Sequence, residues 1–448
     1  MANQNLLTYN SKVTQVKQDF YAPVAIFPGT TSVVSTVYAF LAHVTPWPSD
    51  TNPPVPTQDQ QNIKNIYKSM FVAKKITSND ISPVIERINW VSGTVYDYYQ
   101  DNINMFAVNG SGLLQKKFYV KNKYDQVFKC LWNKNGVAST DEPYFQPGTY
   151  GNFNIYSGSD GYKWKFIYTL PIGSKQKFMD NNFMPVPVGA NTIVAGITAG
   201  GSGNIDIIGV VNGGSNYDPA NSVITVSITG DGTGASAMAR VVNGRVNKIE
   251  VLNYGLGYRY ANVVFNQGGG QGAVARAVMA PYGGHGKDPI TGMFANTLMF
   301  YTNISKDKNQ GFDVNNDFRQ LGIIKNPRQF GSYGNLKSAL ASACYVVTAS
   351  MNTTYFTQDM QVRLGTLTGP RFTIVALTTT SCLLQSIDNA VPAVGSVFLN
   401  SVAQTFSAAG VTTPTADKYS GHILFIDNKQ AFTPTADQTV TLRTVIKF

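Results

Sequence analysis

Residues 157–171 read SGSDGYKWKFIYTLP, and from Tyr162 to Tyr168 an aromatic residue occupies every second position. Successive side chains of a β-strand point to opposite faces, so the alternation predicts a strand whose apolar face is formed by Tyr162, Trp164, Phe166, Tyr168 and Leu170. The preceding glycines and aspartate favour a turn, and Pro171 cannot donate a hydrogen bond to a neighbouring strand. We therefore predict a core strand, with Lys163 and Lys165 on its less buried face, toward solvent or a neighbouring subunit.

The composition favours a large protein that is rich in β structure. The chain has 448 residues, of which 43% are hydrophobic and 13% charged, and 41 are glycines. This length exceeds one ordinary hydrophobic core, so we predict several domains. The formal net charge is +10, but lysines and arginines are scattered singly or in pairs. Such scattering is typical of a solvated surface, and we predict no nucleic-acid partner.

The cysteines and the start of the chain point to a reducing compartment. Cys130, Cys344 and Cys382 are odd in number and have no paired spacing, so they indicate neither a disulfide framework nor a zinc site. The first residues, MANQNLL, lack the basic and apolar segments of a signal peptide. No apolar run is long enough to span a bilayer. We expect neither secretion by a signal peptide nor a membrane association.

We assign residues 1–190 to the first part of a β core with N-terminal helices. Residues 13–20 place apolar side chains at helical spacing, which predicts a short helix. Thr57 and Gln60 have the spacing of a capping box, and they precede an apolar stripe made of Ile63, Ile66, Tyr67, Met70 and Phe71. Further strands are predicted at residues 36–44, 90–99, 117–119 and 126–132.

Residues 191–286 are rich in glycine and contain an internal repeat. The segment 216–221, NYDPAN, is echoed by the segment 257–262, GYRYAN. A glycine-rich turn follows each copy, GDGTG at 230–234 and GGGQG at 268–272. Small β units of this kind cannot bury a face alone, so we predict that the two copies pack on one another as an inserted β domain.

The rest of the chain returns to the core and adds a second insert. Residues 287–330 form the second part of the core, with strands at 293–304 and 317–324. Residues 331–417 form an inserted, small barrel-like β domain with a helix-like patch at 336–344 and strands at 361–367, 371–377 and 381–387. Residues 418–448 supply the last core strands, at 422–426 and 439–448. The predicted fold is therefore mainly β: a multidomain β-sandwich-like core with two inserted small β domains and a few short helices.

Three motif-like clusters have simpler structural explanations. Residues 232–237, GTGASA, resemble part of a dinucleotide-binding fingerprint, but no helix is predicted behind them. Residues 313–317, DVNND, supply the first ligands of a calcium loop, but Phe318 replaces the glycine and Ile324 the glutamate. The histidines lack metal-ligand spacing; they are His43, His285 and His422. We predict no cofactor, no metal site and no catalytic residue.

Asp141 and Glu142 form the best candidate pair for a glycosidase. Adjacent residues rarely flank one glycosidic bond, and a solvated loop explains the pair equally well. Tyr144 and Phe145 follow them, and two aromatic side chains could stack on a sugar. Carbohydrate binding therefore remains an alternative.

Taken in order, several segments resemble the baseplate wedge protein of contractile-tailed bacteriophages, the wedge subunit that forms a homodimer in that family. These segments are residues 38–50, the helix from Thr57, 85–90, 129–131, 160–171, 317–327 and 419–428. We take as the structural core signature Trp47, Tyr162, Trp164, Phe166, Phe318 and Arg319. The two predicted inserts have no counterpart in the family pattern.

The resemblance implies a largely β homodimer that assembles with other wedge proteins around the tail hub, without a catalytic site. We therefore expect a structural, non-enzymatic protein of the virion tail baseplate, assembled in the host cytoplasm, with tail-fibre proteins as further candidate partners. A low charged fraction and aromatic strand faces suit a protein that offers surfaces. The alternative is a tail-associated protein that binds a host glycan or a fibre through an insert. A glycosidase that uses Asp141 or Glu142 is a third.

Overall fold

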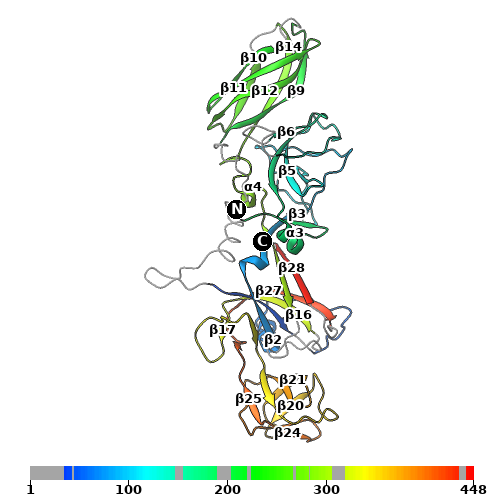
Figure 1. The fold of residues 1–448 in the computed structure, drawn as a ribbon, viewed down its shortest axis with the longest axis vertical. Helices are drawn as coiled ribbons and strands as arrows, with labels where there is room; N and C mark the ends of the chain where they lie inside the picture. Colours follow the sequence, from blue (N-terminus) through cyan, green and yellow to red (C-terminus); the bar gives the residue numbers. More distant parts are fainter. Residues whose placement is uncertain are drawn as a thin grey trace, which may run out of the picture. The chain divides into compact units, whose positions relative to one another are not determined.

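The computed structural model describes residues 35–42, 45–111, 113–146, 155–188, 203–218, 223–265, 269–281, 283–304, 318–432 and 440–447. In these residues the fold is mainly β, as predicted, with antiparallel sheets and a few short helices (Figure 1). The chain divides into two compact units, one with residues 1–15, 82–298 and 447–448, and one with residues 16–81 and 299–446. The predicted helix at 13–20, His43 and the calcium-like segment 313–317 lie outside the described residues.

Unit 1 contains a four-stranded sheet with the order β4-β5-β7-β6. Its strands are β4 (Tyr119–Lys121), β5 (Gln126–Trp132), β6 (Ile155–Ser157) and β7 (Lys163–Thr169). Strand β7 is the predicted aromatic strand. It begins after a turn at Gly161. The φ of Gly161 is +91°, a backbone conformation that glycine adopts readily and residues with a side chain rarely adopt. The side chains that are fully buried include Tyr162, Trp164, Phe166 and Tyr168. The predicted core strand is therefore confirmed.

The second face of this sheet is also covered, contrary to our expectation for the lysines. Lys165 is only 3% exposed, and Lys163 is partly buried. The covering layer comes from β9 (Ile205–Ser215) and β14 (Gln271–Met279), and one shared apolar cluster contains Leu131, Trp132, Ile207 and Val278. The expectation that Lys165 meets solvent or a neighbouring subunit is therefore wrong, because the local pattern gives no sign of a layer supplied by later residues.

The segment 90–99 is not a strand. Its one β-bridge joins Thr94 to Ser139. Tyr96 is 1% exposed and packs edge-on against Trp164, with ring centroids 5.5 Å apart. Tyr96, one of the aromatic residues that favoured a strand prediction, thus covers β7. The remaining elements of this part are β3 (Ile81–Glu86), which pairs with β8 (Phe183–Pro185), and the helices α3 (Ile172–Phe178) and α4 (Pro289–Gly292).

In the described residues the two sequence repeats form the six strands β9 to β14, drawn in green in Figure 1. The first copy supplies β9, β10 (Val223–Gly230) and β11 (Thr233–Val242), and the second supplies β12 (Arg245–Leu256), β13 (Ala261–Phe265) and β14. The first strand of each copy pairs with the last strand of the other, since β12 pairs with β11 and β9 with β14. The middle strands, β10 and β13, pair with each other. The copies therefore exchange strands and share one hydrophobic cluster.

The repeated tyrosines explain the repeated glycines. Tyr217 and Tyr258 are 3% and 5% exposed. Their backbone N–H groups donate reciprocally across the copies, Tyr217 to Gly244 O and Tyr258 to Gly203 O, both at 3.1 Å. A Cβ atom on Gly232 would lie 2.4 Å from the Tyr258 ring, and one on Gly270 would lie 2.3 Å from the Tyr217 ring. These glycines make room for tyrosine rings in a β structure, as their position between predicted strands suggested.

We expect Gly232→Ala to lower the free energy of unfolding by about 1–3 kcal/mol, because the added methyl group overlaps the Tyr258 ring and the Leu256 carbonyl oxygen. The control is Gly173→Ala in α3, where a Cβ atom meets nothing within 4 Å. That change is expected to be neutral or slightly stabilising, because alanine is the better helix former. Urea unfolding of both variants measures the difference. Equal stability would mean that the Tyr258 ring moves aside without cost.

Unit 2 contains a five-stranded sheet with the order β18-β2-β1-β16-β27. Its strands are β1 (Val37–Ala42), β2 (Met70–Ile76), β16 (Phe318–Lys325), β18 (Leu340–Ser342) and β27 (His422–Phe432). All six residues of β1 are buried. Beside these strands lie β15 (Thr297–Ile304), the 3₁₀ helix η1 (Ser78–Asp80) and β28 (Val440–Lys447), which neighbours β15. The predicted helix-like patch at 336–344 is wrong, since β18 occupies its centre and pairs with β2.

Helix α2 (Gln60–Ser69) is present, but its cap differs from the prediction. Asp59 is the N-cap residue, and its carboxylate accepts the Asn62 N–H at 2.7 Å. The Thr57 hydroxyl instead donates to Asp59. An aspartate directly before the first turn caps a helix as well as threonine does, and it is nearer to the free N–H groups. The apolar stripe begins in the helix, with Ile66 buried, and its last two positions belong to β2.

Residues 345–412 form a curled sheet with the order β24-β23-β20-β21-β22-β19-β25, part of which is drawn in yellow and orange in Figure 1. Its strands are β19 (Tyr345–Thr348), β20 (Gln361–Leu364), β21 (Arg371–Leu377), β22 (Ser381–Ser386), β23 (Val397–Leu399), β24 (Thr405–Ser407) and β25 (Gly410–Thr412). The edge strands β24 and β25 follow each other in sequence. Ala408 N–H donates to Ser396 O, directly before β23, and Ala409 N–H donates to Thr348 O of β19, so this segment bonds near both ends of the strand order. Two short strands, β17 (Arg328–Gln329) and β26 (Ala416–Asp417), pair beside it.

Candidate functional site

Three distant segments of unit 2 meet around Asp50. The Asp50 carboxylate accepts the Trp47 backbone N–H at 2.8 Å. It also forms a bidentate ion pair with Arg319, with Nε to Oδ1 at 2.9 Å and Nη2 to Oδ2 at 3.1 Å. Arg319 is 5% exposed, and the Arg319 and Asp50 positions are 269 residues apart. The pair therefore fixes the loop after β1 to strand β16.

Strand β27 joins the same group. The Trp47 indole N–H donates to Lys429 O at 3.0 Å. The Asn428 side chain donates to Pro54 O at 2.8 Å and accepts from Gln320 at 2.7 Å. We call this set the Asp50 cluster; it consists of Trp47, Asp50, Arg319, Gln320, Asn428 and Lys429. Phe318, the remaining signature residue of this unit, is 3% exposed and starts β16.

We expect Arg319→Lys to lower the free energy of unfolding by about 1–2 kcal/mol, because lysine cannot reproduce a bidentate contact and Arg319 is buried. The matched control is Arg240→Lys. Arg240 makes the same two contacts to Glu250, at 3.0 and 3.1 Å, but is 51% exposed, so its pair contributes little. Denaturant unfolding compares the two variants. Losses of the same size would contradict a special role for the buried pair.

A second group, of buried charges, lies between the sheet of unit 1 and the repeats. Lys129 on β5 and Lys165 on β7 are directly opposite each other in the register of the two strands. They are 2% and 3% exposed, and Asp206 on β9, which interacts electrostatically with both, is 4% exposed. The group thus places two potential positive charges and one carboxylate in a buried region. Two like charges opposite each other on neighbouring strands are unfavourable.

Two ring side chains complete this group. The Lys129 ammonium lies 4.0 Å from the centroid of the Tyr99 ring, which His285 meets edge-on at 4.7 Å. His285 Nε2 is 3.7 Å from Asp206 Oδ2, too far for a hydrogen bond. Among the described residues, neither ring nitrogen of His285 nor Asp206 Oδ2 has a hydrogen-bond partner. We call Tyr99, Lys129, Lys165, Asp206 and His285 the junction cluster.

Burial shifts every charged group of the junction cluster toward its neutral form. It lowers the pKa of Lys129 to about 7, although Asp206 acts in the opposite direction. It raises the pKa of Asp206 to about 6, against the effect of Lys165 and Lys129. Burial, reinforced by the two lysines, lowers the pKa of His285 well below its usual value. Desolvation thus outweighs mutual attraction in this group, in which Lys129 is only 2% exposed.

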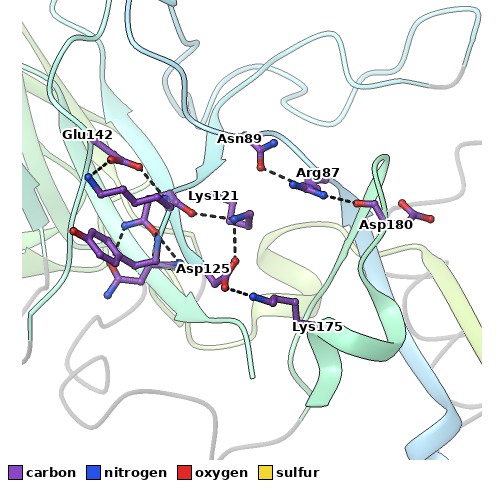
Figure 2. A network of polar contacts seen from close by, with 11 residues as sticks. Arg87, Asn89, Lys121, Asp125, Glu142, Lys175 and Asp180 are labelled. Atoms are coloured by element: carbon purple, nitrogen blue, oxygen red, sulfur yellow. Dashed lines mark hydrogen bonds and ion pairs between the residues drawn. The ribbon is translucent and has the colours of Figure 1, made fainter. Parts of the chain in front are cut away.

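The β4–β5 turn carries a third polar group, shown in Figure 2. Lys121 Nζ contacts Asp125 Oδ1 at 2.9 Å, and Lys175 of α3 contacts Asp125 Oδ2 at 2.6 Å. Asp125 has a φ of 59°, and the Asn122 side chain accepts the N–H groups of Tyr124 and Gln126, each at 2.9 Å. These contacts hold a tight turn in place. They indicate a rigid loop.

Asp141 and Glu142 are occupied by loop contacts. Asp141 accepts from the Ser159 N–H at 2.7 Å and from its hydroxyl at 3.0 Å. Despite partial desolvation, such hydrogen bonds lower its pKa, whereas a glycosidase general acid needs a raised pKa. Glu142 accepts the Lys123 N–H at 2.9 Å and pairs with its ammonium at 3.2 Å. These contacts favour the solvated-loop explanation over the glycosidase hypothesis.

The two aromatic residues after this pair differ in exposure. Phe145 is 6% exposed and stacks on Phe166 with ring centroids 4.0 Å apart. Tyr144 is 39% exposed and forms an edge-on pair with Tyr124, which is 54% exposed, at 5.2 Å. The outward aromatic pair is therefore Tyr124 and Tyr144, and the predicted combination with Phe145 is wrong. The turn that presents Tyr124 is the rigid turn of Figure 2.

The junction cluster was not predicted from the sequence. One signal was present, because Asp206 interrupts the apolar run Ile205, Ile207 and Ile208 of a strand. Lys129, Lys165 and His285 carried no comparable signal in the sequence. In the described part of the chain, no three His, Cys, Asp or Glu side chains converge on a possible metal position. No helix there is both long and apolar enough to cross a membrane.

Sequence comparison finds no match to this chain, either among family models or among curated proteins.

Proposed function

We propose that the chain is a structural protein of a phage contractile-tail baseplate, which forms a wedge-subunit dimer and joins neighbouring baseplate proteins during virion assembly in the host cytoplasm. The observation that supports this proposal is the Asp50 cluster. Residues from three of the segments that carry the resemblance lie there although they are far apart in sequence: Arg319 of 317–327 contacts Asp50 of 38–50, and Gln320 contacts Asn428 of 419–428.

The proposal is tested by the state of the purified chain and by its place in a particle. Light scattering is expected to give a mass of twice 48.6 kDa, and a reconstruction of the tail is expected to place the chain in the baseplate. Co-expression with candidate wedge proteins should yield a complex. A strictly monomeric chain that enters no particle would contradict the proposal.

A second candidate function, binding of a host glycan by a tail-associated protein, is favoured by the pair of Tyr124 and Tyr144. Both rings are exposed, and the ion pair between Lys123 and Glu142 supplies a donor and an acceptor beside them. Exposed aromatic rings with adjacent polar groups suit the apolar and polar faces of a sugar. A glycan array with the full chain tests it, with the double variant Tyr124→Ala, Tyr144→Ala as control. Signals that are equal for both proteins would remove this support.

A further inference from the structure

The loop between β1 and α2 contains an uncharged proline-rich segment, residues 51–57, TNPPVPT, which we call the strap. Each proline fixes its own φ near −65°, and each residue before a proline is restricted to extended conformations. Asn52, Pro53 and Val55 all precede prolines. The sequence therefore dictates an extended strap of polyproline II type, and the structure assigns no helix or strand to it.

The exposure of the strap repeats every third residue. Pro53 and Pro56 are partly buried, whereas the other residues from 51 to 57 are exposed. Polyproline II has three residues per turn, so two prolines three apart face the protein and the residues between them face outward. Val55 is 84% exposed. Pro54 and Val55 thus form an outward apolar ridge.

The strap is held at both ends. At its start, Gln430 donates to Thr51 O at 3.0 Å, and in its middle Asn428 donates to Pro54 O at 2.8 Å. At its end, the Asn62 side chain of α2 donates to Thr57 O at 2.7 Å. The conformational entropy of the ridge is therefore lost on folding and need not be lost again on binding.

Covering an edge strand explains only one side of the strap. Among the described strands, β27 lies at the edge of its sheet, and a loop with prolines protects such an edge from pairing with other chains. That role accounts for the contacts of Asn428 and Gln430 with the strap. It does not require two apolar residues to point into solvent.

We propose that the strap docks a partner protein whose surface has a shallow groove lined by aromatic side chains, with Pro54 and Val55 as the residues that enter it. Aromatic-lined grooves recognise polyproline II segments because these are rigid and apolar. The carboxylates that flank the strap have partners within the chain, since Asp50 pairs with Arg319 and Asp59 caps α2. The ridge itself is uncharged, so it does not favour a basic partner. This inference rests on the proposed function, because the proposed function places the partner protein in the phage tail.

The experiment replaces Val55 by the photo-crosslinker p-benzoylphenylalanine in chains assembled into tail particles. Irradiation is expected to link position 55 to one partner chain, at a segment that contains aromatic residues. The control position is Val402, which is 68% exposed on the curled sheet and is expected to give no such adduct. In parallel, Val55→Asp is expected to reduce incorporation into particles by about tenfold or more, as for a central apolar contact, whereas Val402→Asp leaves it unchanged.

The outcomes separate the two proposals. If the chain is absent from purified tails, the proposed function fails, and the strap partner fails with it. If the chain is present but position 55 gives no adduct, or links to a segment without aromatic residues, only the strap inference is overturned. Unchanged incorporation of Val55→Asp would also overturn it. Equal thermal midpoints of the two aspartate variants, expected because both valines are exposed, show that a loss of incorporation is not a loss of folding.

Discussion

Trp164→Ala is expected to lower the free energy of unfolding by about 3–5 kcal/mol, the usual cost of removing a buried aromatic side chain. Trp164 is completely buried. It stacks on Tyr162 and meets Tyr96 edge-on, both with ring centroids 5.5 Å apart. Its loss leaves a cavity at the point where β7 and the irregular segment before β4 pack together. Urea unfolding of the full chain measures the effect, and we expect the variant to unfold or to fail to dimerise.

Trp164→Phe separates the packing from the polar atom of the indole. Among the described residues, the buried Nε1 of Trp164 has no hydrogen-bond partner. Phenylalanine keeps part of the ring packing and removes this N–H, so we expect it to cost clearly less than alanine. Thr169→Ala, at an exposed position of the same strand, is the control and should change stability little. A melt of Trp164→Ala identical to that of the native chain would show that the aromatic face is not core.

Lys129→Met is expected to raise the free energy of unfolding at pH 7, by on the order of 2 kcal/mol. Two lysines share one carboxylate in the junction cluster, and methionine fills a similar volume without a charge. Its sulfur keeps a favourable contact with Tyr99, which the Lys129 ammonium now approaches to 4.0 Å. After the change, Lys165 and Asp206 remain as a balanced pair.

The stabilisation expected from Lys129→Met depends on pH, because Lys129 loses its proton at a lower pH in the folded chain than in the unfolded chain. The pKa of Lys129 is about 7 in the folded chain, below its ordinary value of 10.5. Between these two values the unfolded chain binds the proton and the folded chain does not, so the native protein gains stability as the pH rises from 7 toward 10.5. The cost of burying Lys129 is complete below pH 7 and absent above pH 10.5. The advantage of Lys129→Met should therefore shrink steadily over this range.

Thermal unfolding at several pH values between 7 and 10 measures the shrinking advantage. Lys117→Met, at an exposed lysine, is the control and should show no comparable change. If Lys129→Met lowered the stability at pH 7, the ammonium would be making a contribution that its burial does not suggest. An advantage that stayed constant with pH would mean that the gain comes from packing alone.

Much of the fold could be predicted where the local pattern decides the structure. Residues 126–132 and 371–377 are strands within the predicted bounds, because alternation and turn residues mark both ends. The segment 90–99 failed for a physical reason. Of its aromatic residues, Tyr96 is buried against Trp164 of β7 and Tyr98 packs on Trp132 of β5. Packing contacts of this kind favour the same composition as a strand.

The contacts between distant segments could be predicted only in part. The similarity singled out Trp47 and Arg319, but nothing in the sequence showed that Asp50 joins them. The repeat could be seen in the sequence. The exchange of strands between the copies could not be predicted, because pairing within a copy and pairing between copies satisfy the same apolar pattern. The covering of Lys165 could not be predicted, because the layer formed by β9 and β14 comes from residues that follow it by more than one element.

The exchange of strands between the repeats bears on how this region folds and on how it can be cut. Because β9 pairs with β14 and β11 with β12, neither copy can complete its own sheet. During synthesis, β9 must wait for the last strand of the region before it gains its partner, which makes these contacts non-local and slow to form. A fragment that ended after the first copy would leave open strand edges and could close them only with another such fragment. Two fragments that divide residues 203–279 between them should therefore associate through the same strands that the intact chain pairs internally.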